Sequence, residues 1–310
     1  MASRRHFLKM SVLFAAGMSV RPGAWALEPP VRSPAVRHFL CFGDWGFTGR
    51  EQGRVARAMT VFLKANPGYH GVLSLGDNFY GELKKGVHDI RWKAEFEEMY
   101  PRPVFDQPFY ALLGNHDYDD QEGKAQIELD YAAAHPGTRW TLPSRWYRTD
   151  FTDDSGRSLM TALTLDSNHS NLAKKQWKEQ IAWLERQLSG PRGRWTLVMA
   201  HHPLFTNGTH GDNDTLIDEW GPLFEKYRVD AYLAGHDHDL EHLQVKGYST
   251  DFLISGGGGA PTRPGQTDEN RVFYRSVYGF MHLAVGPEEF AIRFYDAEGA
   301  VLYGYQRIPT

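Results

Sequence analysis

The stretch Val229-Asp230-Ala231-Tyr232-Leu233-Ala234-Gly235-His236-Asp237-His238 joins a short apolar run to a turn that carries two histidines. The run predicts a buried strand over 229–233, and Gly235 marks the turn that follows it. Two imidazoles placed two residues apart on such a turn can point at one spot beyond the sheet edge, where open α/β sheets keep their ligands. Alone, the pair does not separate metal ligands from two solvated loop histidines. The other motifs of the chain distinguish these two interpretations.

Four other predicted strands end in a similar way. The runs 37–42, 71–75 and 108–113 each lead into glycine followed by an acid or amide, and the run 195–200 leads into histidine. Because parallel strands bring their C-terminal ends to one crevice, we expect all five ends to meet at one rim of one sheet. The side chains gathered there would be Asp44, Asp77, Tyr80, Asn115, His201, His236 and His238.

The segments between these strands have the spacing of amphipathic helices, which indicates an α/β protein. Helices are predicted over 52–65, 90–99, 121–134, 171–188 and 215–227. Two further strands are expected over 146–151 and 158–165. The C-terminal part has apolar runs at 253–254, 280–285, 290–295 and 301–305 and little helical pattern. We expect it to supply a second sheet, which gives a layered α/β/β/α sandwich.

Composition limits the class of protein. A chain of 310 residues that is 41% hydrophobic can bury a large core, and we favour one large domain. The formal net charge is -4 and becomes more negative once a basic leader is removed, which argues against a nucleic-acid-binding surface. Cys41, the one cysteine, lies inside a strand and is expected to be a core residue.

The first 26 residues have the features of an export signal. Ser3-Arg4-Arg5-His6-Phe7-Leu8-Lys9 matches the twin-arginine pattern, an apolar region covers 11–20, and Ala24-Trp25-Ala26 offers a cleavage site. The apolar run is too short to favour a membrane anchor. We therefore predict a twin-arginine signal peptide over 1–26, a proline-rich linker over 27–35, and one catalytic domain over 36–310.

The gathered side chains have the chemistry of a two-metal site. Taken singly, each has an ordinary structural explanation, such as a helix cap for Asp44 or a core histidine for His201. Together, buried carboxylates and imidazoles would repel or lose hydration unless cations neutralised them. A mixture of carboxylate, phenolate, amide and imidazole suits two hard or borderline metals bridged by one carboxylate, for which Asp77 is the natural candidate.

These motifs resemble those of the purple acid phosphatase branch of the calcineurin-like metallophosphoesterases, of the small single-domain, tartrate-resistant type. The matching residues are Gly43-Asp44-Trp45-Gly46, Gly76-Asp77-Asn78-Phe79-Tyr80, Gly114-Asn115-His116-Asp117, Ala200-His201-His202-Pro203 and Gly235-His236-Asp237-His238. They follow the family order from about residue 36 onward. Other metallophosphoesterases have Asp-x-His in the first motif, whereas Trp45 and Gly46 follow Asp44 here and Tyr80 replaces the missing imidazole. The resemblance implies a four-layer α/β/β/α metallophosphoesterase sandwich of two mixed sheets.

The resemblance also implies the cofactors and their ligands. Asp44, Asp77, Tyr80 and His238 would bind Fe(III), and Asp77, Asn115, His201 and His236 would bind a divalent Fe, Zn or Mn. Phenolate and carboxylate oxygens favour the harder trivalent ion, which agrees with this division. A tyrosinate on ferric iron would make the protein purple.

Two further histidines are assigned catalytic roles by the same resemblance. His116 would contact the phosphate, and His210 would protonate the leaving oxygen, although a solvated loop position remains open for either. His202 receives no catalytic role, and His242 is expected at the surface or behind the ligands. The expected reaction is acid phosphatase chemistry, in which a metal-bound hydroxide attacks a phosphate monoester.

Several alternatives and partners accompany this hypothesis. A phosphodiesterase or nucleotidase with the same centre, or a binding protein without catalysis, stays open. The expected partners are a small phosphorylated substrate and the twin-arginine export machinery, without nucleic acid or a stable membrane anchor. We expect a monomer in the periplasm or secreted. The substrate pocket is expected between the loops 81–88, 206–214 and 256–266.

Overall fold

The computed structural model describes residues 33–265 and 270–307. The predicted signal peptide over 1–26 lies outside the described residues, as does most of the predicted linker. Among the helices of the described part, none is long and apolar enough to cross a membrane.

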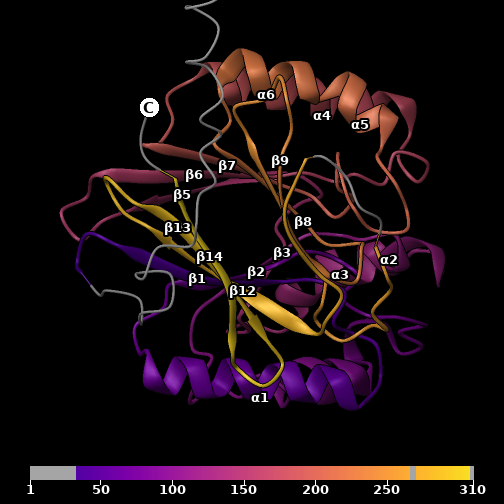
Figure 1. Cartoon of the computed structure of the whole chain (residues 1–310). Helices are drawn as coiled ribbons and strands as arrows, with labels where there is room; N and C mark the ends of the chain where they lie inside the picture. The colour runs from indigo at the N-terminus through magenta and orange to yellow at the C-terminus, as the bar shows by residue number, and fades with distance from the viewer. Residues whose placement is uncertain (1–32, 266–269, 308–310) are drawn as a thin grey trace, which may run out of the picture.

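Two mixed sheets of seven strands each form the centre of the molecule (Figure 1). The first sheet has the order β14-β13-β12-β1-β2-β3-β4. Its strands are β1 (Arg37–Phe42), β2 (Gly71–Ser74), β3 (Phe109–Ala111), β4 (Trp140–Thr141), β12 (Gly279–Val285), β13 (Phe290–Asp296) and β14 (Val301–Arg307). Strands β1 to β4 are parallel, and β12 to β14 are antiparallel to their neighbours.

The second sheet has the order β11-β9-β10-β8-β7-β6-β5. Its strands are β5 (Tyr147–Thr152), β6 (Ser158–Thr164), β7 (Trp195–Met199), β8 (Ala231–Ala234), β9 (Leu240–Gln244), β10 (Asp251–Ser255) and β11 (Arg271–Arg275). Strands β6, β7, β8 and β10 are parallel, so their C-terminal ends share one rim.

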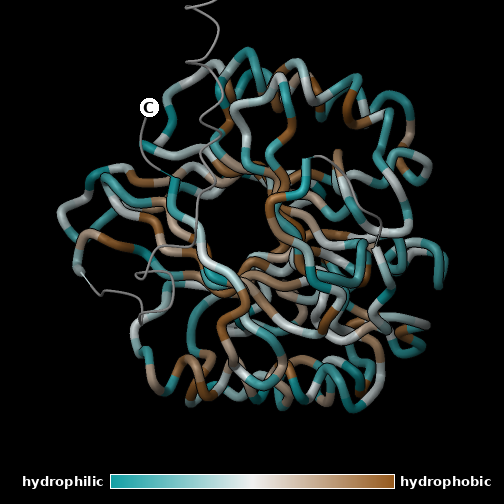
Figure 2. Tube along the Cα trace, in the orientation of Figure 1, coloured by the Kyte–Doolittle hydropathy of each residue, from teal (hydrophilic) through white to brown (hydrophobic). Residues whose placement is uncertain are grey.

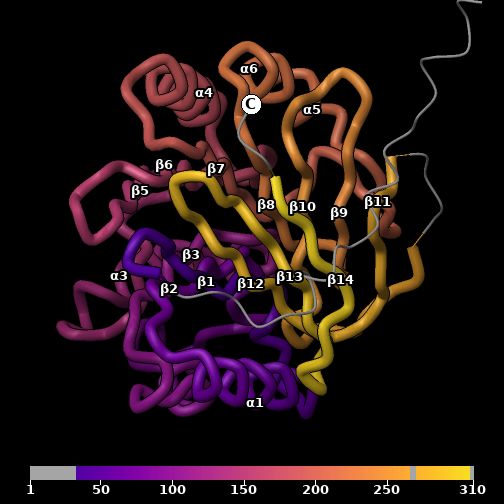
Figure 3. Tube along the Cα trace, turned by 60° about the vertical axis from the view of Figure 1, so that its left-hand side comes forward, coloured from indigo at the N-terminus to yellow at the C-terminus, as the bar shows by residue number. Residues whose placement is uncertain are grey.

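Helices cover the outer face of each sheet (Figures 1 and 3). The elements on the side of the first sheet are α1 (Arg50–Ala65), η2 (Gly86–His88), the π-helix η3 (Trp92–Glu97), α2 (His116–Asp119) and α3 (Lys124–Ala134). Those on the second sheet are α4 (Lys174–Ser189), α5 (Asp214–Glu219) and α6 (Gly221–Tyr227). Residues of high hydropathy concentrate along the central strands (Figure 2).

Three large apolar clusters fill the spaces between the four layers. The middle cluster lies between the sheets and includes Phe39 and Leu73 from the first and Leu197 and Leu233 from the second. Cys41 belongs to this cluster and is fully buried, as predicted. Strands covered on both faces become continuous apolar runs, which explains why the central strands were predictable from sequence. The predicted four-layer sandwich is confirmed.

The structure corrects three expectations about the elements. The last three strands do not build the second sheet, because β12 returns to pair with β1 and extends the first sheet. The predicted helix over 215–227 is interrupted at Trp220, because Pro222 lacks the N–H that a continuous helix would need and begins α6 instead. His242 is neither at the surface nor behind the ligands: it is fully buried on β9 between Asp251 and Tyr303.

Candidate metal centre

The predicted ligands come from both sheets. Asp44 follows β1, Asp77 and Tyr80 follow β2, and Asn115 follows β3, all in the first sheet. His201 follows β7, and His236 and His238 follow β8, in the second sheet. The expectation that all five strand ends share one sheet is therefore wrong. The two sheets pack face to face and present their parallel ends to the same side, which brings the motifs together.

Backbone hydrogen bonds hold these strand ends close together. The Asp44 N–H donates to the Gly76 carbonyl over 2.9 Å, and the Gly235 N–H donates to the His201 carbonyl over 3.0 Å. The His236 N–H crosses between the sheets and donates to Oδ2 of Asp44 over 3.0 Å. The site is thus part of the seam that joins the two sheets.

Four of the predicted ligands form a first group. Oη of Tyr80 lies 3.1 Å from Nε2 of His238 and 3.4 Å from Oδ1 of Asp44. Nε2 of His238 lies 3.4 Å from the same Asp44 oxygen. Asp44, Asp77 and His238 each offer a donor atom within 4.8 Å of the others. A single cation can reach this set of oxygen and nitrogen donors.

The other ligands form a second group around Asn115. Its Oδ1 lies 3.1 Å from Nε2 of His201 and 3.0 Å from Nδ1 of His236. These two imidazole nitrogens are 3.3 Å apart, and Nε2 of His201 is 3.4 Å from Oδ1 of Asp77. Asp77 therefore borders both groups, as its predicted bridging position requires.

Outer contacts fix which nitrogen two of the histidines present. Nδ1 of His201 lies 2.8 Å from the Leu75 carbonyl, and Nδ1 of His238 lies 2.8 Å from the Pro261 carbonyl. A carbonyl can only accept, so each Nδ1 carries a hydrogen, and Nε2 is the nitrogen whose lone pair would bind a metal once any proton on it has left. Metal-binding histidines have this arrangement. The donor set and its orientation fit two cations.

Burial and charge set the protonation of the donors. Burial raises the pKa of Tyr80 well above its usual range, and the carboxylates of Asp77 and Asp44 raise it further. Burial alone would raise the pKa of Asp77, but the neighbouring His201 outweighs it and holds this pKa below the usual range. Burial disfavours the charged form of His201, but the carboxylates of Asp77 and Asp44 outweigh burial and raise the pKa of His201 to about 10. Tyr80 and His201 must each lose a proton to bind a metal, so metal binding should weaken in acid.

Comparison with known families identifies the chain. The profile described as "Calcineurin-like phosphoesterase" matches residues 37–240, which span every predicted metal ligand.

The chain belongs to the calcineurin-like phosphoesterase family.

Relatives place this phosphoesterase in the purple acid phosphatase branch. It is 30% identical to tartrate-resistant acid phosphatase type 5 of Oryctolagus cuniculus over 87% of this chain and 90% of that protein. It is 31% identical to purple acid phosphatase 7 of Arabidopsis thaliana, over 89% of this chain and 88% of that one.

Solved structures share its fold. "GAP50 the anchor in the inner membrane complex of Plasmodium" superposes with a TM-score of 0.79 at 22% identity, covering 89% of this chain and 90% of that one. Purple acid phosphatase PPD1 from yellow lupin superposes with a TM-score of 0.69 at 17% identity, covering 90% of this chain and 54% of that one. At such identities the likeness concerns the fold.

The two predicted catalytic histidines of this phosphoesterase lie beside different ligand groups. The His116 ring lies 4.3 Å from the Tyr80 ring, and its Nδ1 is 3.0 Å from Oδ1 of Asp120. The His210 ring lies 4.0 Å from the His236 ring, and its Nδ1 is 2.7 Å from Oδ1 of Asp237. Each histidine is held by a carboxylate, an arrangement that suits contact with a phosphate or transfer of a proton.

Asp117 is a supporting residue whose role the sequence reasoning missed. It is fully buried, and its carboxylate accepts hydrogen bonds from the Asn78 N–H over 3.0 Å and the Gly114 N–H over 2.8 Å. It therefore ties the loop that carries Asp77 and Tyr80 to the loop that carries Asn115. An acid beside two motif residues was visible in the sequence, but its backbone partners were not.

A second missed set lies beside His202, to which no catalytic role was assigned. The centre of the His202 ring lies 4.4 Å from that of His236 with the ring planes tilted by 52°, and Nδ1 of His202 lies 2.8 Å from Oγ of Ser167. Ser167 follows β6, a strand whose end carries no ligand motif. The segment 167–171 lines a cavity next to Asn115 and His202, although it was not among the predicted pocket loops.

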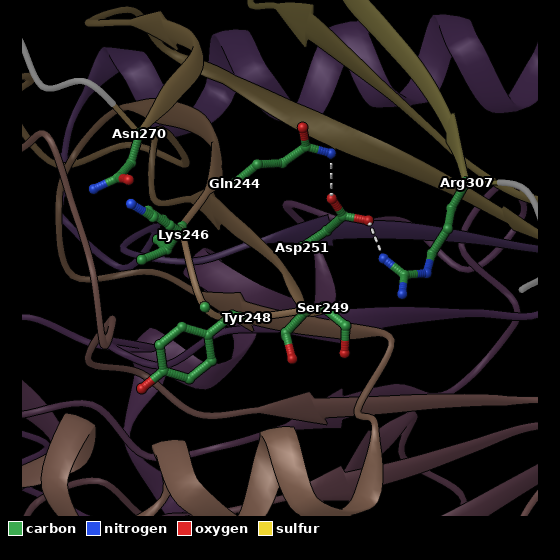
Figure 4. A pocket seen from close by; sticks show the side chains of 10 residues that line it. Gln244, Lys246, Tyr248, Ser249, Asp251, Asn270 and Arg307 are labelled. Carbon is green, nitrogen blue, oxygen red and sulfur yellow. Dashed lines mark hydrogen bonds and ion pairs between the residues drawn. The ribbon is translucent and has the colours of Figure 1, made fainter. Parts of the chain in front are cut away.

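A separate cavity of about 510 Å³ lies beside the turn between β9 and β10 (Figure 4). None of its lining residues is a predicted metal ligand. Asp251 accepts hydrogen bonds there from Gln244 over 2.9 Å and from Arg307 over 2.8 Å. Asp251 and Arg307 thus compensate each other's charge, and the predicted ligands lie at the strand ends instead.

Proposed function

We propose that this phosphoesterase is an acid phosphatase that hydrolyses phosphate monoesters at a centre of two metal ions. The observation that carries the proposal is the pair of donor groups that meet at Asp77. Membership of the purple acid phosphatase branch supports it, since relatives at about 30% identity are named acid phosphatases.

The metals follow from the donor chemistry. Asp44, Asp77, Tyr80 and His238 would hold Fe(III), and Asp77, Asn115, His201 and His236 would hold a divalent Fe, Zn or Mn. When bound, two such cations supply Lewis-acid stabilisation of a phosphoryl group and activation of water.

The chain itself would orient the substrate and move one proton. His116 and His210 each lie beside one of the two groups and could contact phosphate oxygens. His210 would transfer a proton to the departing alkoxide, while Asp237 at Nδ1 keeps the ring oriented. Nη1 of Arg263 lies 3.0 Å from Nε2 of His210, and because a guanidinium can only donate, Nε2 accepts this hydrogen bond. Arg263 would have to turn from Nε2 to the anionic substrate before His210 could act as the acid.

Metal analysis combined with two substrates tests the function. The purified protein should contain two metal ions per chain and hydrolyse an aryl phosphate monoester faster than the matching bis-aryl diester. A strong diester preference would favour the alternative, a phosphodiesterase or nucleotidase with the same centre. A fully metallated protein without any hydrolysis would indicate a binding protein on this fold.

The ferric assignment makes a spectroscopic prediction. Tyr80→Phe should abolish the visible tyrosinate band, because its phenolate oxygen is the donor to iron. Tyr303→Phe, which removes a hydroxyl on a half-buried side chain bonded to His242, should keep the band and serves as the control. An unchanged band in Tyr80→Phe contradicts the assignment even if the enzyme is active.

We also propose that the protein is exported folded through the twin-arginine route to the periplasm or beyond. The pattern from Ser3 to Lys9 and the cleavage motif at 24–26 support it. Replacing Arg4 and Arg5 together by lysine should retain the protein in the cytoplasm with its signal uncleaved. Export of that variant would contradict the proposal.

A further inference from the structure

The loop that carries Tyr80 is fastened on both sides of that residue. The carbonyl of Phe79, on one side, accepts a hydrogen bond from Nζ of Lys124. The N–H of Gly81, on the other side, donates to Oδ2 of Asp120 over 2.5 Å. Asp120 follows α2 and Lys124 begins α3, so one short stretch of chain fixes both peptide groups that flank a predicted metal ligand.

The same two side chains also hold His116. Nζ of Lys124 donates to the His116 carbonyl over 2.9 Å, and Nδ1 of His116 lies 3.0 Å from Oδ1 of Asp120. Nζ of Lys124 lies 3.8 Å from Oδ2 of Asp120, so the two residues form an ion pair. The centres of the His116 and Tyr80 rings are 4.3 Å apart. One ion pair therefore contacts both the predicted phosphate contact and the loop of a predicted iron ligand.

The burial of Lys124 indicates that its charge is needed where it lies. Its side chain is 0% exposed, although lysine is almost never fully buried unless it is paired. A buried ammonium loses its hydration, a cost that an apolar side chain of similar length would not have. Burial raises the pKa of Asp117, and the charge of Lys124 opposes this rise. Lys124 thus belongs to the polar support of the ligand loops rather than to apolar packing.

We propose that Lys124 and Asp120 are positioning residues for the reaction: their ion pair orients His116 toward the phosphate and at the same time holds Tyr80 in place for the metal. This inference rests on the proposed function, which puts a phosphate at His116 and a metal at Tyr80. Groups that are held in their bound positions beforehand lose less conformational freedom when a ligand arrives. Loss of the ion pair should therefore weaken the binding of both ligands.

Two variants test the proposal at both ends of the ion pair. Asp120→Ala and Lys124→Met should each weaken the binding of inorganic phosphate to the fully metallated protein by about tenfold in calorimetry, because His116 loses its orientation. Both should also weaken metal binding by about tenfold, measured as metal retained against a chelator, because the Tyr80 loop is no longer fixed. The Asp120 side chain is 22% exposed, so Asp120→Ala supplies the test if Lys124→Met does not fold.

Double variants show whether each effect passes through the residue to which it is assigned. In a His116→Ala background, Asp120→Ala should change the phosphate affinity by less than about twofold but should still weaken metal binding. In a Tyr80→Phe background, the same substitution should change the metal affinity by less than about twofold but should still weaken phosphate binding. A general loosening of the structure would instead lower both affinities in both backgrounds.

Asp130→Ala is the matched control, because it removes an exposed carboxylate of α3 that accepts a hydrogen bond from Gln126. It should change neither affinity by more than about twofold. The inference is overturned if Asp120→Ala behaves like Asp130→Ala, or if its effects have the same size in the single and double variants. Absence of all hydrolysis would refute the proposed function alone, because both affinities are measured without turnover.

Discussion

At the scale of single residues, the two outer histidines depend on carboxylates that the motifs do not explain. Asp237 stands between the ligands His236 and His238, yet its side chain turns away from the donors and contacts His210 and Thr206. Burial alone would raise the pKa of Asp237, but the hydrogen bonds from His210 and Thr206 and the charge of His210 together outweigh it and keep this pKa below its usual value. Asp237 is therefore a charged partner that holds His210 in place.

Asp237→Asn should lower kcat by about 10- to 100-fold, because His210 would lose the charge that orients it and stabilises its protonated form. Metal content should stay at two ions, since the donor groups keep their atoms. In a His210→Ala background, Asp237→Asn should lower kcat by a much smaller factor. Asp218→Asn, on the exposed face of α5, is the control, and equal losses in both backgrounds would contradict the coupling.

At the scale of elements, the strand ends are shaped to bring ligands very close to one another. Asp44, Asp77 and His236 have left-handed backbone conformations, with φ of 59°, 49° and 70°. Such a conformation costs a residue other than glycine about 1–2 kcal/mol. Non-glycine residues held this way are typical of functional sites, where the surrounding structure imposes the geometry. Here the tight turns send each side chain toward the seam.

Gly235→Ala tests this close approach. The added Cβ would lie 2.6 Å from Oδ2 of Asp44 and 3.0 Å from the Leu75 carbonyl. The added Cβ would displace the carboxylate of Asp44, which is a predicted metal ligand. Metal affinity should therefore fall by about tenfold or more, as happens when contacts that orient metal ligands are lost. Metal titration followed by the visible band measures it.

Gly53→Ala is the matched control for that substitution. Gly53 lies inside α1, where the new Cβ would meet the flexible end of Arg57 at 3.3 Å and Sδ of Met99 at 4.0 Å. Alanine is a better helix former, so the free energy of unfolding should rise by about 0.5–1 kcal/mol while metal binding is kept. Normal metal affinity of Gly235→Ala would show that the backbone at Gly235 and the Asp44 side chain can move apart without disturbing the site.

At the scale of the whole molecule, the two sheets are also joined far from the metal centre. Arg307 at the end of β14 in the first sheet contacts Asp251 on β10 in the second over 2.8 Å. The Asp251 side chain is only 2% exposed and the Arg307 side chain 14%. Burial alone would raise the pKa of Asp251, but His242, Gln244 and Arg307 lower it below its usual value.

Arg307→Met should lower the free energy of unfolding at pH 7 by about 3 kcal/mol, because it leaves a buried carboxylate without its cation. A carboxyl whose pKa is depressed on folding stabilises the protein above its unfolded pKa, and the stabilisation is lost as the pH falls. The deficit of the variant should therefore shrink below about pH 4. Urea unfolding at pH 7 and pH 3.5 measures it.

Lys226→Met is the comparison, because it breaks the exposed pair with Glu185 and should cost less than about 1 kcal/mol at either pH. A deficit of Arg307→Met that stayed constant down to pH 3.5 would mean that lost packing, rather than the charge of Asp251, is responsible.

The sequence by itself determined the central strands, most helices and the residues that gather at the metal centre. Continuous apolar runs identify strands buried on both faces, and helical spacing identifies the covering layers. The division of the ligands between two metal ions was implied by the family resemblance, in agreement with donor chemistry, and stays a prediction.

Only the tertiary structure decided how the strands are shared between sheets and what surrounds the ligands. The apolar pattern of a strand does not encode which other strand it pairs with. The pairing of β12 with β1 and the origin of the site from two sheets were therefore missed. The role of Asp117 was missed for a related reason. It is defined by the backbone groups of Asn78 and Gly114, which come together only when β2 and β3 pair side by side.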